Sequence, residues 1–355
     1  MANILYTDYY IPENRIPTGK YFEMVDIPVP KIYSSKEEYC EAYVKQTKVE
    51  YVCIENKFNL VEIFSDMLTK MFENTGIDRN QIKYIFYTRA YQTYYNLYGD
   101  GKYYGKNIDD RGSDLPYYLN IPYYLTEKFQ LKNTCVITSD GKCGSITQAM
   151  DLGAMCCDMK KGYALILTPS ISGRANRYLN FTLIGDGAGI MLLSSNKEDG
   201  DLEIVDTFTR TNGKLSHRIM NSSQNLSYLQ EVLSFIDPLN VIYDSRFKSE
   251  VLDLHGIKEE DIKAVITLNI NNIINRYSDV YPSKVYAGNL PYGGHISDVD
   301  LIRNLKDLIL KDFIPLSKPG SGDYILILTS GTDFTGIEYG GVLLRYRKED
   351  TVLAV

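Results

Sequence analysis

Apolar residues recur along this chain at two different spacings, and the two spacings alternate. Between Leu60 and Thr75 they follow one another every three or four residues, which is the period of one helix face, and Gly76 ends the run. The next apolar run, residues 82–88, is too short for a helix and has the length of a buried strand. This alternation continues along the chain and predicts a mixed α/β fold.

The same reasoning places the remaining elements. The polar stretch 90–114, rich in Tyr and Gly, is predicted to be a loop that covers an active site. Because several predicted strands are almost continuously apolar, helices are expected on both faces of mixed sheets. The other predicted elements are a strand and hairpin within 1–30, helices over 35–48, 121–129 and 146–157, strands over 134–138, 163–168 and 264–268, and two strands within 181–194 separated by Gly185-Asp186-Gly187-Ala188-Gly189.

A faint internal repeat divides the chain into two halves. Residues 76–88 read GIDRNQIKYIFYT and residues 256–268 read GIKEEDIKAVITL, while GYALILTPS at 162–170 matches GDYILILTS at 322–330. Two halves of this size indicate one duplicated β/α unit rather than a solenoid, which needs at least three shorter repeats. We therefore predict an N-terminal half over 1–198 and a C-terminal half over 199–355.

Each half contains a turn of small residues that opens a helix. The two turns are Lys142-Cys143-Gly144 and Gly293-Gly294-His295. When the halves are superposed, Cys143 and His295 take equivalent places at the helix starts, and both helix N-termini point at one shared cleft. The sequence thus predicts a single site, with a nucleophile from the first half and polar partners from the second.

Cys143 is the candidate nucleophile, because it lies between a predicted strand and a predicted helix, within TSDGKCGS. A sulfur at a helix N-terminus is close to the positive end of the helix dipole and to free N–H groups, which favour the thiolate. The same N–H groups can bind the oxyanion that forms when a carbonyl is attacked. The competing interpretation is a small buried residue in a tight turn, since free cysteine commonly packs as a hydrophobe.

Composition fits a globular enzyme and excludes several classes of protein. Apolar residues make up 44% and charged residues 23%, so a packed core is expected and wholesale disorder is not. The net charge of −7 argues against a general nucleic-acid binder. No apolar run long enough to span a membrane and no signal-peptide pattern occurs. The six cysteines lack metal-site spacing, so we expect no metal site and a cytoplasmic protein.

Three segments together resemble the thiolase superfamily, and most closely β-ketoacyl-acyl-carrier-protein synthase III and related acyltransferases. These segments are Asp140-Gly141-Lys142-Cys143-Gly144 with the helix after it, the strand GYALILTPS, and Ile184-Gly185-Asp186-Gly187-Ala188-Gly189. The likeness runs from around Tyr43 to TGIEYGGVLLRY, which ends at Tyr346. It implies a five-layer αβαβα fold of two duplicated halves, a homodimer, no bound cofactor, and acyl-coenzyme A or an acyl carrier protein as substrate.

One departure from the family concerns the polar residues of the second half. Synthase III enzymes carry a His after the second-half strand, where this chain has Asn269, and an Asn at the next helix start, where this chain has His295. The two residues are exchanged, which is the order found in thiolases proper. The second thiolase cysteine is missing, because the C-terminal loop reads Thr329-Ser330-Gly331-Thr332.

The resemblance implies a role for each matched residue. Cys143 would attack an acyl thioester and carry the acyl group. His295 would move the proton, and Asn269 would orient a carbonyl or a water; the alternative for both is an ordinary turn or strand-end residue. Backbone N–H groups would form the oxyanion hole, and basic side chains are weaker candidates for binding the phosphates of coenzyme A or of a carrier protein. The N–H groups are those of Cys143, Ser330, Gly331 and Thr332, and the basic residues are Arg174, Arg177, Arg210 and Arg218.

Three functions remain open at this point. The favoured one is an acyltransferase or condensing enzyme of specialised, natural-product metabolism that works through an acyl-cysteine. The second is a decarboxylative ketoacyl synthase III of fatty-acid or polyketide initiation, and the third is a non-catalytic partner subunit with the same fold. We also expect the homodimer interface to run along an edge strand at 163–168, because an exposed apolar edge must be paired.

Overall fold

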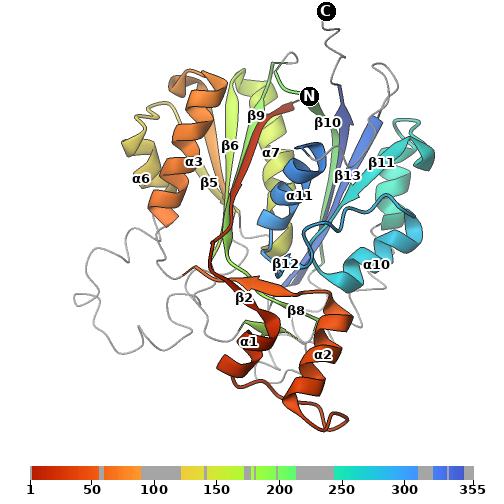
Figure 1. The fold of residues 1–355 in the computed structure, drawn as a ribbon. Helices are drawn as coiled ribbons and strands as arrows, with labels where there is room; N and C mark the ends of the chain where they lie inside the picture. Colours follow the sequence, from red (N-terminus) through yellow and green to blue (C-terminus); the bar gives the residue numbers. More distant parts are fainter. Residues whose placement is uncertain are drawn as a thin grey trace, which may run out of the picture.

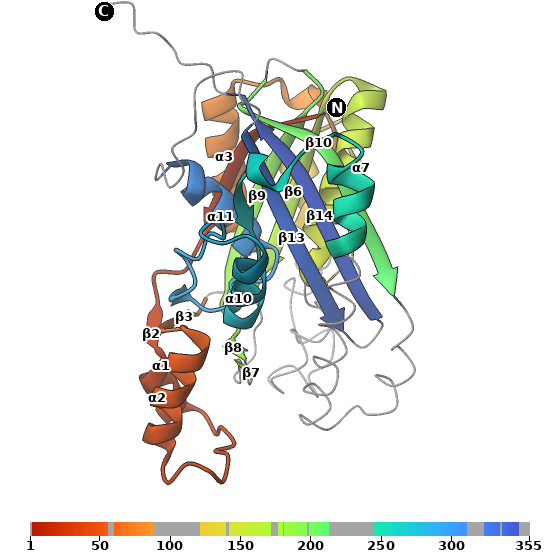
Figure 2. The ribbon, with the colours of Figure 1, turned by 90° about the vertical axis from the view of Figure 1, so that its right-hand side faces the viewer.

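The computed structural model of the protein describes ten stretches of the chain. Helices and strands occur where the apolar pattern predicts them in most of these stretches, and the two chain halves meet in one body (Figures 1 and 2). The predicted loop 90–114 lies outside the described residues. The described stretches are 2–55, 60–88, 121–139, 142–171, 177–179, 181–196, 199–212, 244–310, 323–333 and 336–347.

The first half contributes five strands in the order β1-β9-β6-β4-β5. β4 runs parallel to its neighbours β5 and β6, whereas β9 is antiparallel to both β6 and β1. Parallel pairs of this kind need a crossover helix, and the helix after β5 supplies one. The bounds are β1 (Asn3–Tyr10), β4 (Ile82–Thr88), β5 (Cys135–Ser139), β6 (Tyr163–Ser170) and β9 (Gly187–Ser194).

The second half repeats this order as β10-β14-β13-β11. β11 is parallel to β13, and β14 is antiparallel to both β13 and β10, as in the first half. A parallel bridge from Val265 to Val285 stands where the first half has β5. The topology therefore confirms the duplication seen in the sequence. The bounds are β10 (Leu202–Asn212), β11 (Ile262–Ile266), β13 (Asp323–Asp333) and β14 (Gly336–Tyr346).

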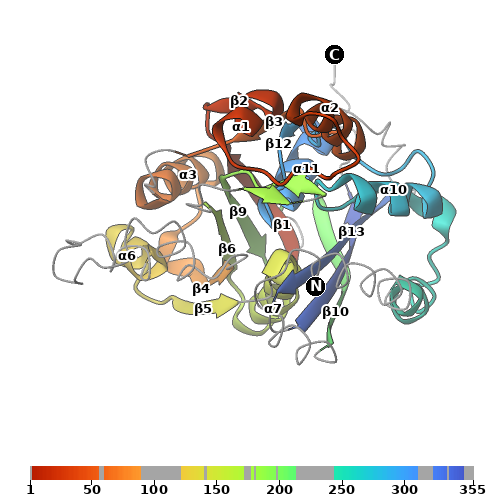
Figure 3. The same ribbon diagram turned by 90° about the horizontal axis from the view of Figure 1, so that it is seen from below.

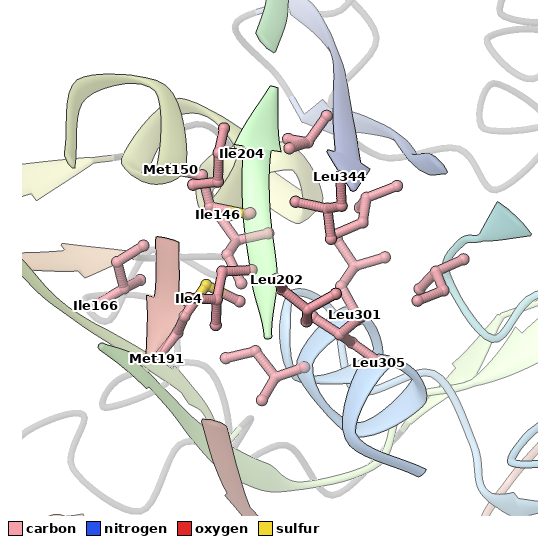
Figure 4. Packing of buried hydrophobic residues seen from close by; sticks show 14 of the residues in the cluster. Ile4, Ile146, Met150, Ile166, Met191, Leu202, Ile204, Leu301, Leu305 and Leu344 are labelled. Atoms are coloured by element: carbon pink, nitrogen blue, oxygen red, sulfur yellow. The ribbon is translucent and has the colours of Figure 1, made fainter. Parts of the chain in front are cut away.

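Helices and sheets form five layers. α7 and α11 lie between the two half-sheets, and their apolar faces share one core with inward side chains of both, such as Ile166 and Leu344 (Figures 3 and 4). α3 and α6 cover the outer face of the first half-sheet, and α10 covers that of the second. The predicted αβαβα arrangement is confirmed. The bounds are α3 (Leu60–Thr75), α6 (Ile121–Lys128), α7 (Ser145–Lys160), α10 (Asn271–Val280) and α11 (Val299–Leu310), with short turns at Arg79–Gln81, Lys142–Gly144, Lys248–Leu252 and Glu259–Asp261.

A small tyrosine-rich unit lies below the sheets in the view of Figure 1. Its core packs Phe22, Tyr39, Tyr43 and Tyr178 ring against ring. Much of the Tyr content of the chain is thus structural. The prediction of a strand and hairpin within 1–30 missed α1, whose seven residues are too few to show a helical period. The bounds are β2 (Arg15–Pro17), α1 (Thr18–Met24), α2 (Lys36–Thr47), β3 (Tyr51–Cys53), β7 (Tyr178–Leu179), β8 (Thr182–Leu183) and β12 (Tyr292–Gly293).

The predicted interface along 163–168 is wrong, because β6 is an interior strand paired on both sides with β4 and β9. Its apolar character reflects this central position. The strand at the first-half edge of the sheet is β5, which is short and partly exposed. Within the described stretches, no helix is long and apolar enough to cross a membrane.

Candidate active site

The turn that carries Cys143 is held by hydrogen bonds to its backbone. A short turn (η3, Lys142–Gly144) joins the end of β5 to α7, and Cys143 is half-buried within it. The Thr329 hydroxyl on β13 donates to the Cys143 carbonyl over 2.8 Å, and the Thr147 hydroxyl donates to the Gly144 carbonyl over 2.8 Å. The sulfur is therefore presented at the start of α7 by a backbone that residues of β13 and of α7 itself fix in place.

The loop that carries His295 is fixed by the glycine-rich turn of the first half. The His295 N–H donates to the Leu183 carbonyl over 2.7 Å, and the Gly185 N–H donates to the His295 carbonyl over 3.0 Å. A Cβ on Gly185 would lie 1.9 Å from the Gly293 carbonyl oxygen. Gly294 has a φ of +73°, and a Cβ there would lie 2.4 Å from the Leu183 carbonyl oxygen. Both glycines are needed for this close backbone approach.

Cys143, His295 and Asp300 form a continuous line of contacts. The Cys143 Sγ lies 3.4 Å from His295 Nε2, and His295 Nδ1 lies 2.7 Å from Asp300 Oδ2. His295 is 3% exposed and Asp300 is fully buried. A carboxylate on Nδ1 fixes the imidazole tautomer and leaves Nε2 facing the sulfur.

The charge balance of this line favours a protonated imidazole beside the sulfur. Burial alone lowers the pKa of His295, but the Cys143 sulfur and the Asp300 carboxylate outweigh burial and raise that pKa well above its usual range. The arrangement therefore suits a thiolate–imidazolium pair, with Asp300 stabilising the cation. This geometry can support nucleophilic attack by sulfur and proton transfer through Nε2.

Asp300 is the residue that the sequence prediction missed. Its carboxyl oxygens accept hydrogen bonds from the His295 ring, from the backbone and side-chain nitrogens of Asn269 and from the Ile296 N–H, at distances between 2.7 and 3.1 Å. Four donors on one buried carboxyl stabilise its ionised form. A usable signal was present in the sequence, because Asp300 and Asn304 are polar residues one helical turn apart in the otherwise largely apolar run VDLIRNLKDLIL, residues 299–310, which follows His295.

Comparison with known proteins by sequence finds no matching family description and no matching curated protein. Comparison by structure finds many matches. ChlB3, an acyltransferase, superposes with a TM-score of 0.71 at 14% identity, over 98% of both chains. The 3-oxoacyl-[acyl-carrier-protein] synthase III of Aquifex aeolicus gives 0.69 at 17% identity over 98% of this chain and all of its own. OleA of Xanthomonas campestris gives 0.68 at 11% identity, over 97% and 98% of the two chains.

This chain has the thiolase fold. The agreement covers nearly the whole length of both partners, so the fold inferred from the Cys143 and glycine-rich segments is confirmed. At identities of 11–17% the likeness concerns the fold alone.

Asn269 follows β11 in this thiolase-fold protein, and its side chain is hydrogen-bonded to two residues of α11. Its Nδ2 donates to Asp300 Oδ1 over 2.9 Å, and its Oδ1 accepts from Asn304 Nδ2 over 2.9 Å. The predicted role of Asn269, to orient a carbonyl or a water, stays a prediction, because the contacts of its side chain in the structure are with Asp300 and Asn304. Asn269 instead holds Asp300, and Asn304 holds Asn269 while also donating to the Thr267 carbonyl.

The predicted oxyanion-hole segment runs within β13, beside the Cys143 turn. β11 ends opposite Ile327, so one edge of β13 beyond that point is free of strand pairing and lies against η3. The Gly331 nitrogen is 3.8 Å from where a Gly144 Cβ would be. N–H groups alternate between the two edges along a strand, so the N–H groups of Ser330 and Thr332 face the edge opposite to that of Gly331. Among the predicted strand donors, Gly331 is the one whose nitrogen lies close to the Cys143 turn.

The four candidate arginines do not gather at the site. Arg177 is 2% exposed and forms a two-point ion pair with Asp186 at 2.7 Å on each arm. The prediction that Arg177 contacts a substrate phosphate is wrong, because its guanidinium is buried and already bound. Arg210 is at the surface, paired with Glu250 and stacked on Phe208. Arg174 and Arg218 lie outside the described residues.

The other histidines and cysteines are not part of the line of contacts from Cys143 to His295 to Asp300. His255 is partly exposed and contacts Asp206, as a surface residue would, and His217 lies outside the described residues. All six cysteines are free, and Cys157 is buried while Cys156 is only partly buried. In the described stretches, no group of His, Cys, Asp or Glu side chains has the geometry of a metal site.

Proposed function

We propose that this protein is an acyltransferase that uses acyl thioesters and works through a covalent acyl-Cys143 intermediate. The observation that carries the proposal is the continuous line from Cys143 to His295 to Asp300. The thiolase fold supports it, since structures with this fold include an acyltransferase and a synthase that is named for its acyl carrier protein. The six free cysteines suit work in the reducing cytoplasm.

Acylation is the first half of the proposed reaction. The Cys143 thiolate attacks the thioester carbonyl, and a new S–C bond forms while the carbonyl electrons move to oxygen. When the tetrahedral intermediate collapses, the bond from carbon to the donor sulfur breaks, and the His295 imidazolium gives its proton to the departing thiolate. The imidazole is then neutral, and the acyl group remains on Cys143.

Transfer to an acceptor is the second half. The neutral His295 Nε2 takes a proton from an acceptor O–H or N–H as that atom attacks the acyl-cysteine carbonyl. The bond from carbon to the Cys143 sulfur breaks, which restores the thiolate beside the imidazolium. Asp300 supports both halves, because it stabilises the cation whenever His295 carries the proton.

Two backbone N–H groups are the proposed oxyanion donors. One belongs to Cys143, at the start of α7, where helix N–H groups lack internal partners. The other belongs to Gly331, on the free edge of β13. Each donor stabilises the tetrahedral oxyanion more than the flat carbonyl, and the loss of one typically costs about 10²–10³ in rate.

Transfer to oxygen or nitrogen suits this site better than carbon–carbon bond formation. Decarboxylative condensation needs two donors on the nascent enolate, and with Asn269 turned toward Asp300 only His295 remains of the predicted pair. Non-decarboxylative condensation needs a second base, and the segment 329–332, where the resemblance expects the second cysteine, contains no Cys. A non-catalytic partner subunit would have no use for three connected polar residues that are costly to bury. We further propose a role in natural-product biosynthesis.

The test is an acyl-loading experiment followed by a chase. Purified protein is incubated with a panel of acyl-coenzyme A thioesters, and the adduct is located by peptide mass spectrometry. We expect the adduct on the Cys143 peptide, and none in Cys143→Ala, while Cys157→Ala loads normally because that buried thiol lies on the far end of α7. Release of the acyl group by simple alcohols or amines supports transfer; release only by malonyl-coenzyme A indicates condensation. The absence of any adduct would contradict the proposal.

We also propose that two copies pair through the β5 edge. β5 ends the sheet, and α7 beside it exposes Leu152 (43%), Met155 (55%) and Met159 (70%) on one side. These three residues follow the i, i+3, i+7 spacing of a helix face, and a patch of this kind is typical of an interface. A second copy would cover the patch and continue the sheet, which removes an exposed strand edge.

A further inference from the structure

Asp298 is a buried carboxyl beside Cys143, His295 and Asp300, and the proposed reaction does not use it. It lies two residues before Asp300 at the start of α11, and it is 1% exposed. Across the described stretches, neither of its oxygens has a hydrogen bond of normal geometry, although the Ile146 N–H and the Thr88 hydroxyl approach the carboxyl and partly offset its burial. An ionised carboxylate in such a place is costly, because burial removes its water and these looser contacts replace only part of it.

The contrast with Asp300 shows which of the two carboxyls carries the charge. Asp300 accepts four hydrogen bonds, including one from His295 at 2.7 Å. Asp298 accepts none of normal geometry. One imidazolium cannot neutralise two adjacent carboxylates, so the carboxyl that accepts these hydrogen bonds carries the charge and the other keeps its proton.

The groups around Asp298 come from three elements. On β4 the fully buried Thr88 hydroxyl and on α7 the Ile146 N–H both approach the carboxyl, without a hydrogen bond of normal geometry from the hydroxyl. The charged groups that face it among the described residues are His295 and Asp300, with Cys143 beyond His295. Burial raises the pKa of Asp298 to about 8, and the Asp300 charge adds to this, while Ile146, Thr88 and His295 oppose it.

We propose that Asp298 is a positioning residue that acts as an uncharged carboxylic acid, leaving His295 with a single ionised partner so that the imidazole can both release and regain its proton. This inference rests on the proposed acyl-transfer function. During transfer to the acceptor, His295 must be neutral in order to act as a base. A second carboxylate would hold the imidazole in its cationic form and stop that step, so turnover should fall as Asp298 ionises.

Infrared difference spectroscopy tests the charge of Asp298 without any substrate. The wild-type spectrum minus that of Asp298→Asn should show the C=O stretch of a protonated carboxyl at about pH 6, displaced in D₂O and lost at about pH 9. Asp300→Asn is the matched control, two residues away in the first turn of α11, and its difference spectrum should show carboxylate bands instead. Carboxylate bands at about pH 6 for Asp298→Asn would overturn the proposal.

A second measurement needs no variant at position 298, in case Asp298→Asn does not fold. In protein labelled with ¹³C at aspartate carboxyl carbons, one carboxyl signal should titrate at about pH 8 in the folded protein. This transition should disappear when the protein is unfolded. If no aspartate titrates above about pH 6, the proposal fails. Both readouts are independent of acyl loading, so a protein that loads no acyl group but shows the protonated carboxyl refutes the proposed function and leaves this charge assignment standing.

Discussion

The two helix starts that build the site come from duplicated halves, yet they supply opposite chemistry. In the first half, η3 leads directly into α7, and the Cys143 sulfur is half-buried at the start of this helix. In the second half, the start of α11 buries two carboxyls, Asp298 and Asp300, beside one imidazole. Duplication brings the starts of two helices to one point; in the proposed function, divergence makes one the binder of the oxyanion and the other a source and acceptor of protons.

The largest expected effect comes from removing the polar side chains that the second half contributes to the site. His295→Ala should lower turnover by about 10² or more, because a positioned acid–base group contributes about that much. Asp300→Asn should cost a similar factor, since it removes the charge that stabilises the imidazolium. Asn269→His should not rescue His295→Ala, because position 269 faces Asp300 rather than the sulfur. Steady-state rates with the best acyl donor measure all three, and an unimpaired His295→Ala would remove the second half from the mechanism.

A backbone change sharpens the comparison by moving one helix start against the other. Gly185→Ala places a Cβ 1.9 Å from the Gly293 carbonyl oxygen, so the loop must shift and carry His295 away from Cys143. We expect a large loss of activity and a melting temperature several degrees lower. Gly256→Ala is the matched control for an ordinary glycine effect, because its φ is +64° and no atom lies within 4 Å of the added Cβ. Equal rate losses in both variants would contradict the positioning role of Gly185.

The pH dependence of stability distinguishes the two carboxyls of the second half. The folded pKa of Asp298 is raised to about 8 while the unfolded value is about 4, so the unfolded chain gives up its proton first as pH rises. Wild-type stability should therefore fall relative to Asp298→Asn between about pH 4 and about pH 8. Thermal unfolding of both proteins across this range measures it, and a constant difference would show that Asp298 titrates normally.

The smallest expected effect concerns the exposed apolar patch on α7, in the first half. Leu152→Lys with Met155→Lys should convert a dimer into a monomer of 40.5 kDa, because two charges cannot be buried in the proposed interface. Met24→Lys, at a residue 60% exposed on α1, is the control and should leave the dimer intact. Light scattering at micromolar concentration reports the mass. A wild-type monomer would remove the proposed interface altogether.

The sequence predicted elements where a period or a family motif was present, and failed where the answer depended on neighbours. The helix over 60–75 and the strand over 82–88 were predicted to the residue, since their apolar spacing is regular. The strand over 163–168 was correctly found but wrongly placed at an edge, because strand order is a matter of tertiary pairing. Asp300 was missed because an acid in the first turn of a helix also fits the helix dipole. The sequence identified Asn269 as a candidate, but the orientation of its side chain depends on its hydrogen bond to Asp300.

The account depends most on Cys143, His295 and Asp300 acting as one unit, and competitive iodoacetamide labelling tests this directly. In the wild type, Cys143 should label fastest of the six cysteines, well ahead of the partly buried Cys156 on α7. His295→Ala and Asp300→Asn should each slow labelling of Cys143, and the double variant should be no slower than His295→Ala alone, because residues that work through one another are not additive. Equal labelling of Cys143 and Cys156 in the wild type, or additive losses in the double variant, would contradict the account.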